Sequence, residues 1–310
     1  MLLARTLGAL LAPLASLLRR PACGGYPGVE EIALVSIPAL RPLSLTRGAS
    51  RGALSFAMQL TVLGTGTIAF SPARSCAGYY VEAGNAKLLM DCGAGTTRRL
   101  AELAIPWQEI THVALTHFHI DHHADLPTII FAWKYGQLPP RSAPLDIIGP
   151  VGTMELLVRL QAAYGEWVTL PGFPVRVTEL DPGASVDLGG ATLSCTKVPH
   201  APESVAYSIT EGSHRLVYSG DTGLSPELAE WARGCDMLVL ECSLPTSMAI
   251  AEHLTPEQCG EMARLAEPRQ LVLTHLYPPV EMVDIPALVG ASYTGSVVVA
   301  RDGYRAVLED

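Results

Sequence analysis

The 310-residue sequence has little of what marks a nucleic-acid-binding protein. It contains only three lysines and carries a formal net charge of −9. Residues 58–310 hold 15 Lys and Arg against 28 Asp and Glu, a net charge of −13. Phosphate contacts supply much of the affinity of nucleic-acid binders, so this acidic balance favours a small substrate over a long polyanion. It does not remove RNA from consideration, because a local basic patch is compatible with it.

A long apolar run is also missing. The N-terminal run Leu7–Leu18 is interrupted by Pro13, and a membrane-spanning helix needs roughly 20 apolar residues. We therefore predict no membrane association. Residues 1–57 have three interpretations: a secretory signal, a transit peptide, or an extension upstream of the true start. Arginine content and the absence of acids before Glu30 favour the transit peptide, and we expect a leader or a poorly ordered N-terminal extension.

Paired cysteines are the third absence. The chain has seven cysteines, an odd number with no regular spacing. This predicts reduced thiols and a cytoplasmic location, or an organellar or exported one if residues 1–57 are a genuine leader. Cys92 and Cys242 lie near expected strand ends, where we interpret them as small buried hydrophobes rather than metal ligands.

Histidines, in contrast, are concentrated. Four of the nine fall at positions 117, 119, 122 and 123, directly after the apolar run His112–Thr116. Side chains alternate in an extended segment, so His117 and His119 share a face and can share a metal. Asp121 and His122 follow where the chain should turn into a helix, close enough to serve a second metal. A histidine-rich loop is the alternative, but the joint pattern behind a buried strand favours a two-metal site.

Further metal-binding side chains follow other apolar segments. Val198-Pro199-His200 closes the stretch Ala191–Thr196, Gly220-Asp221 follows Leu216–Ser219, and His275 ends Leu271–Thr274. Each could separately be a buried polar residue or an exposed turn. Together they repeat one chemical type at one topological position, the end of a strand.

These motifs, with Leu63-Gly-Thr-Gly-Thr67 and Leu88-Leu-Met-Asp91-Cys-Gly-Ala-Gly95, resemble the metallo-β-lactamase superfamily and, within it, the ribonuclease Z-like hydrolases. The resemblance runs from Met58 to Asp310, and Met58 stands where members of this family commonly begin. It implies an α/β fold, a four-layer αββα sandwich, in one hydrolase domain over residues 58–310.

The resemblance also implies the roles of the site residues. His117, His119 and His200 would hold one divalent metal; Asp121, His122 and His275 the other; and Asp221 would bridge them. Asp91 would orient the ligands. We expect two zinc ions because the set is rich in imidazole, and manganese is compatible with the carboxylates.

His253-Leu-Thr255 resembles the His-x-Thr element of ribonuclease Z-like phosphodiesterases. The resemblance implies that His253 protonates the leaving oxygen. Asp121 would hold the water that the two metals share and remove its proton, which gives the attacking hydroxide. Alternatively, His253 only precedes a helix, because Thr255-Pro256 is a typical N-cap followed by proline.

Two departures argue against processing of transfer RNA. Only residues 201–220 separate His200 from Asp221, too few for the docking arm that the family places there, and Ile68–Arg74 replaces the usual first loop. We therefore predict a phosphodiesterase acting on small or cyclic phosphodiesters. A ribonuclease Z-type RNA 3′-end endonuclease, a lactonase or arylsulfatase-like esterase, and a non-catalytic metal-binding scaffold are the alternatives. Relatives suggest a possible homodimer.

Aromatic residues near the motifs are possible substrate contacts: Trp133, Tyr135 and Tyr277. The spacing of Asp125–Tyr135 predicts a helix packed on the sheet, so core packing is the alternative for Trp133 and Tyr135 and the expectation for Phe131. Helices are also expected over Gly152–Ala163 and Pro256–Arg264. Strands are expected at Leu60–Leu63, Gly78–Glu82, Lys87–Asp91, His112–Thr116, Leu145–Ile148, Leu216–Ser219, Met237–Glu241 and Ser296–Arg301.

Overall fold

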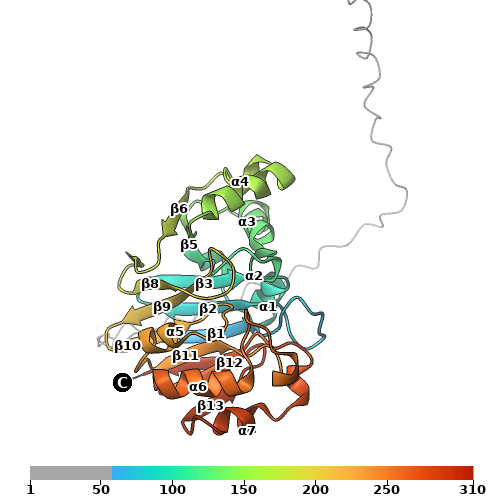
Figure 1. The fold of residues 1–310 in the computed structure, drawn as a ribbon. Coiled ribbons are helices and arrows are strands. Elements are labelled where there is room, and N and C mark those ends of the chain that lie inside the picture. Colours follow the sequence, from blue (N-terminus) through green and yellow to red (C-terminus); the bar gives the residue numbers. More distant parts are fainter. Residues whose placement is uncertain (1–57, 310) are drawn as a thin grey trace, which may run out of the picture. The chain divides into compact units, whose positions relative to one another are not determined.

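A computed structural model describes residues 58–309, and the predicted leader or extension at residues 1–57 lies outside them. The described chain forms two seven-stranded sheets, drawn in Figure 1. The first sheet has the order β14 (Arg305–Leu308), β1 (Met58–Gly64), β2 (Gly78–Ala83), β3 (Ala86–Cys92), β4 (His112–Ala114), β5 (Leu145–Pro150), β6 (Val175–Leu180). The second has the order β13 (Ser296–Val299), β12 (Gln270–Thr274), β11 (Met237–Glu241), β10 (His214–Tyr218), β9 (Val205–Glu211), β8 (Thr192–Lys197), β7 (Ser185–Asp187).

Helices cover the outer face of each sheet. Over the first sheet lie α1 (Thr96–Glu102), the short α2 (Ile120–His123), α3 (Leu126–Tyr135), α4 (Thr153–Tyr164) and the 3₁₀ turns η1 (Trp107–Glu109) and η2 (Glu166–Val168). Over the second lie α5 (Pro226–Trp231), α6 (Pro256–Ala266) and α7 (Ile285–Gly290), with η3 (Thr246–Met248) and η4 (Val280–Met282) in the connecting loops. The layers run helix, sheet, sheet, helix, which confirms the predicted four-layer αββα sandwich.

The central strands are apolar throughout because both of their faces are buried. In β11, Met237 and Val239 join the core between the sheets, whereas Leu238 and Leu240 pack under α5 and α6. Burying a side chain of this size contributes roughly 1.5–3 kcal/mol, so such strands are strongly placed by their sequence.

Strand direction then positions the polar residues. Strands β3 to β6 pair in parallel, and so do β10 to β13. Parallel strands linked by helices bring their carboxyl ends to one edge of a sheet, which is where ligands bind in such folds. Asp91 is the next-to-last residue of β3, Glu241 closes β11, and His275 directly follows β12.

The predicted strands and helices agree with the observed ones to within a few residues at each end. Strands β6, β7, β9 and β14 were not among the predicted strands, and β8 was recognised only as an apolar stretch. Among the described residues, no helix combines the length and apolarity that crossing a bilayer would require.

Candidate metal centre

Seven side chains predicted as ligands lie together at the carboxyl ends of the strands. One group comprises His117, His119, His200 and Asp221; a second comprises Asp121, His122 and His275. Within each group the potential ligand atoms all lie within 4.8 Å of one another. These groups bring together the residues predicted for each metal, and a third group of the same kind comprises Asp221, His253 and His275.

Asp221 stands between the groups and turns one carboxylate oxygen to each. Its Oδ2 lies 3.7 Å from Nε2 of both His117 and His200. Its Oδ1 lies 3.2 Å from Nε2 of His122 and 3.4 Å from Nε2 of His275. Asp221 is buried, and burial raises its pKa, but His122 and His275 outweigh this and hold the pKa well below its usual range. The carboxylate is therefore ionised and arranged to face two cations.

Four of the five imidazoles are oriented in the same way. Each places Nδ1 against a protein group and turns Nε2 to the centre. The Nδ1 partners are Thr116 for His117 (3.0 Å), Asp91 for His122 (2.7 Å), the Glu252 carbonyl for His200 (2.9 Å) and Ser243 for His275 (3.0 Å). Such outer partners fix the tautomer and ring angle of metal-binding histidines.

The atoms turned to the centre fit cations better than they fit one another. Nδ1 of His119 and Nε2 of His200 approach to 3.0 Å, and Nε2 of His122 and His275 to 3.4 Å. Nε2 of His117 is buried without a hydrogen-bond partner. Burial, together with the neighbouring imidazoles, lowers the pKa of His117 and His119, which keeps their lone pairs available. Lone pairs brought together without shared protons are the chemistry of a metal site.

Asp91 supports the ligands through hydrogen bonds, although its own carboxylate is not among the potential ligand atoms of either group. Its carboxylate accepts hydrogen bonds from Thr116 N (2.8 Å), Tyr218 Oη (2.8 Å) and His122 Nδ1 (2.7 Å). Asp91 has a φ of 52°, in the left-handed region that non-glycine residues rarely adopt, and His275 has a φ of 53°. Such backbone strain is found at functional sites where the surroundings enforce it.

Comparison with known proteins identifies the family of this chain. Residues 86–276, more than half of the chain, match the family described as the β-lactamase superfamily domain. The chain belongs to the metallo-β-lactamase superfamily. It is therefore a metal-dependent hydrolase of that superfamily, as the sequence predicted.

Relatives in the superfamily cover most of the chain. A ribonuclease Z of Mycobacterium bovis (strain BCG / Pasteur 1173P2) is 28% identical over 273 residues, 80% of this chain and 97% of its own. The metallo-β-lactamase fold protein YhfI of Bacillus subtilis has a TM-score of 0.71 at 25% identity, covering 81% and 99% of the two chains. The short form of human tRNase Z has a TM-score of 0.66 at 23% identity, covering 81% and 100%.

His253 adds an eighth polar group, and Glu241 holds it there. The Nδ1 of His253 lies 2.9 Å from Oε1 of Glu241, and its ring packs 5.0 Å from His200 and 5.6 Å from His275. Burial lowers the pKa of His253, but the hydrogen bond to Glu241 and that carboxylate's charge outweigh burial and raise the pKa to about 9. The contact with Glu241 therefore favours the protonated form of the His253 imidazole.

Sequence reasoning missed Glu241. It is fully buried and accepts hydrogen bonds from Thr222 N (2.7 Å), Leu254 N (3.1 Å) and Ser243 Oγ (2.5 Å) besides His253. A signal was present, because the strand Met237–Glu241 ends in a carboxylate at the same topological position as Asp91.

The three predicted substrate contacts have different positions. Tyr277 stands at the site, its ring 6.0 Å from those of both His253 and His275. Trp133 is fully buried and donates Nε1 to the Trp107 carbonyl at 2.9 Å, so its prediction as a substrate contact is wrong and core packing is right.

Tyr135 ends α3, about 15 Å along the helix axis from its start. It stacks on Phe131 with ring centroids 4.7 Å apart. The geometry gives no support to Tyr135 as a substrate contact. Phe131 is 45% exposed and packs on Trp167, so its expected place in the core is also wrong.

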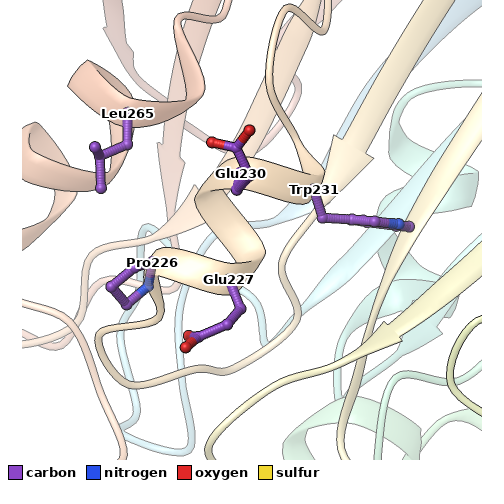
Figure 2. Close-up of a pocket in the computed structure, with 5 residues that line it drawn as sticks. All are labelled: Pro226, Glu227, Glu230, Trp231 and Leu265. Atoms are coloured by element: carbon purple, nitrogen blue, oxygen red, sulfur yellow. The ribbon is translucent and has the colours of Figure 1, made fainter.

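Hollows on the surface of the described residues include a cavity and a groove. A cavity of about 440 Å³ is bounded by the loop Thr67–Cys76 and by Ala94 to Arg99. A groove of about 620 Å³ is lined by Leu265 of α6 and by Pro226, Glu227, Glu230 and Trp231 of α5 (Figure 2). The groove contains no imidazole, and Glu230 is paired with Arg233 at 2.5 Å. None of the seven predicted ligands lines either of these two hollows.

Proposed function

We propose that the protein is a dinuclear metal-dependent phosphodiesterase that acts on small or cyclic phosphodiesters. The observation that carries the proposal is His253, a protonated imidazole held by a buried carboxylate beside seven converging ligands. A phosphodiester needs this group because its alkoxide leaving group must receive a proton. An aryl ester, whose phenolate leaving group is less basic than an alkoxide, has less need of it.

In this proposal His117, His119, His200 and Asp221 hold one divalent cation, and Asp121, His122, His275 and Asp221 hold the second. Two such cations supply positive charge beside the phosphorus and acidify water towards a pKa near 7. Zinc suits five imidazoles best, and manganese suits the carboxylates.

The chain's own residues then move the protons. Burial raises the pKa of the Asp121 carboxyl, but His275 and His122 outweigh burial and lower it, so Asp121 is ionised and can orient the attacking water and accept its proton. With Nδ1 of His253 engaged by Glu241, Nε2 is the donor to the departing oxygen. Tyr277 borders the same space and can contact the substrate.

The hairpin between His200 and Asp221 supports a small substrate. It consists of β9, β10 and a short turn, and both strands belong to the second sheet. It therefore provides no protruding arm for a large RNA, and the net charge of −13 over residues 58–310 points the same way. Ribonuclease Z activity is the second candidate, because curated relatives such as that of Mycobacterium bovis carry that name.

The deciding experiment is a substrate panel with the holoprotein and with chelated protein. The panel contains bis-p-nitrophenyl phosphate, cyclic mononucleotides, RNA with a 3′ trailer, a lactone and an aryl sulfate. We expect metal-dependent turnover of the first two and little of the others. Preference for the trailer RNA would favour ribonuclease Z, a lactone or sulfate preference would favour an esterase, and no turnover at all would favour a metal-binding scaffold.

Two further predictions belong with this proposal. A homodimer is what the family resemblance implies, and sedimentation equilibrium tests it. A cytoplasmic location, or an organellar or exported one if residues 1–57 act as a leader, can be tested by fractionation of cells that express the full chain.

A further inference from the structure

Large exposed apolar side chains are concentrated on the loops around the metal centre. The described residues include 16 such side chains. Five of them lie within five residues of a predicted ligand, His253 or Tyr277, and two more lie on the loop Thr67–Cys76. We call these seven the apolar rim: Ile68, Phe70, Ile120, Leu224, Met248, Ile250 and Met282. Phe70 is 100% exposed and Met282 is 85% exposed. Scattered apolar residues are ordinary on a surface, but a group of this size around a site indicates a binding surface.

Several rim residues lie close in sequence to the predicted site residues. Ile120 directly follows His119, Leu224 comes three residues after Asp221, and Ile250 comes three residues before His253. The loops also touch one another. A Cβ at Gly223 would lie 1.9 Å from the Ala251 carbonyl oxygen, so the Asp221 loop packs directly on the segment before His253.

A second pair of loops is joined in the same way. Arg74 of the loop Thr67–Cys76 forms an ion pair with Glu281 at 2.8 Å, next to Met282. The backbone N–H of Leu276, directly after His275, donates to the Thr65 carbonyl at 2.8 Å. Phe70 and Met282 therefore stand on connected loops at one side of the site.

A cavity of about 440 Å³ lies beside the loop Thr67–Cys76, which carries Ile68 and Phe70. Ile68, Ala69, Phe70 and Pro72 line it, and so does Ala94. Ala94 follows Gly93, where a Cβ would lie 1.9 Å from the Asp121 carbonyl oxygen. The segment next to the cavity therefore packs on the backbone of a predicted ligand.

The arginines of this cavity are already paired with carboxylates. Arg98 and Arg99 bind Glu102, Arg99 also binds the nearly buried Asp302 at 3.1 Å, and Arg74 binds Glu281. The cavity therefore suits an uncharged substituent better than a second phosphate.

We propose that the apolar rim and this cavity bind an apolar alkyl or aryl substituent, so that the substrate is an amphiphilic phosphodiester. This inference rests on the proposed phosphodiesterase function. The metal centre binds the charged phosphodiester, and the apolar rim binds the apolar group attached to it.

A homologous series of p-nitrophenyl alkyl phosphates tests the inference with the metal-loaded protein. Methyl, butyl and octyl esters share one leaving group, so only the apolar substituent changes. Each buried methylene should raise kcat/KM roughly three- to fourfold until the rim is filled, mainly by lowering KM. A benzyl and a cyclohexyl ester then distinguish aryl from alkyl recognition.

Rim variants provide the structural control. Met282→Ser and Phe70→Ser should lower the octyl-to-methyl ratio of kcat/KM by about tenfold. Met154→Ser changes an equally apolar residue, 48% exposed in α4, and should leave that ratio unchanged.

The outcomes separate the two proposals. If the methyl ester is hydrolysed and chain length has no effect, the inference is wrong and the phosphodiesterase proposal stands. If the rim variants keep the chain-length effect but convert a dimer to a monomer in sedimentation, the rim is an interface between copies and the inference is wrong. If no ester is hydrolysed, the phosphodiesterase proposal fails. The rim is then judged by calorimetry, where octyl methyl phosphate binding no tighter than dimethyl phosphate overturns the inference.

Discussion

At the scale of single residues, Asp221 is the carboxylate that lies close to histidines of both ligand groups. Four imidazole nitrogens lie within 3.7 Å of its oxygens on one side or the other: those of His117, His122, His200 and His275. An ionised carboxylate with little exposure is costly unless positive charge compensates it. In the proposed function two cations provide that charge, and Asp221 is the one residue that both of them share.

Asp221→Ala should therefore remove at least one of the two bound metal equivalents. The bridging carboxylate is lost, and the remaining imidazoles of the two groups no longer share an anion. Elemental analysis of the dialysed variant measures this directly. Asp187→Ala, which changes an exposed carboxylate in β7, should keep both ions. Two tightly held ions in the Asp221 variant would contradict the bridging role.

His253→Ala should keep the metals and slow phosphodiester turnover. General acids contribute on the order of 10²- to 10⁴-fold, and the loss should be largest for alkoxide leaving groups, which need a proton most. Comparison of bis-p-nitrophenyl phosphate with an alkyl phosphodiester measures the difference. Equal activity of variant and wild type on the alkyl ester would show that His253 only precedes the helix.

Glu241 acts through His253, so it is a positioning residue. Burial lowers the pKa of His253 and Glu241 raises it, giving about 9. The acid form is present below this pKa and is lost as pH rises through it. Glu241→Gln removes the raising charge, so the alkaline limb of the pH–rate profile should move to lower pH. A uniformly reduced rate with an unmoved alkaline limb would indicate a purely structural effect.

At the scale of elements, the strand ends explain what the sequence could predict. Apolar runs such as Leu271–Thr274 identify buried strands, and the polar residue that follows each run is then a site residue by topology. Glu241 escaped because it ends its run without a histidine beside it and without a resemblance to a ligand motif. Trp133 was ambiguous because helical periodicity locates the apolar face of α3 but not how far along it the site extends.

The N-cap of α6 is the element that fixes His253 in the loop before it. Thr255 accepts a hydrogen bond from Gln258 N, and the Gln258 side chain accepts one from Thr255 N, a reciprocal capping box. The Leu254 N–H bound to Glu241 ties the same segment to β11. The Thr of the His-x-Thr motif is therefore also the residue that caps the predicted helix.

Thr255→Ala should cost about 1 kcal/mol of folding free energy through loss of the cap. It should also lower kcat more than it raises KM, because the loop that places His253 loosens. Thr255→Ser keeps the hydroxyl and should restore most of both. Thermal unfolding and steady-state kinetics on the three proteins measure the effects, and an Ala variant that matches wild type in kcat would separate the cap from catalysis.

At the scale of the whole molecule, neither sheet holds a complete site. The first sheet supplies Asp91 and, after β4, the histidine cluster, and the second supplies Asp221, Glu241 and His275 from the ends of β10 to β12. Tyr79 of the first sheet and Tyr218 of the second stack at 4.4 Å in the core beneath the site. Packing of the two sheets is therefore what brings the two ligand groups within reach of Asp221.

All the strands of the two sheets come from the described residues. Strand β1 begins at Met58 and pairs with β2 and β14, so every described strand finds its neighbours among residues 58–309. Deletion of residues 1–57 should leave the melting temperature within about 2 °C, a shift that corresponds to less than about 1 kcal/mol at this size, and turnover unchanged. Differential scanning calorimetry and the bis-p-nitrophenyl phosphate assay on both chains measure this. An insoluble or inactive product would show that residues 1–57 belong to the hydrolase domain, and the boundary proposed at Met58 would be wrong.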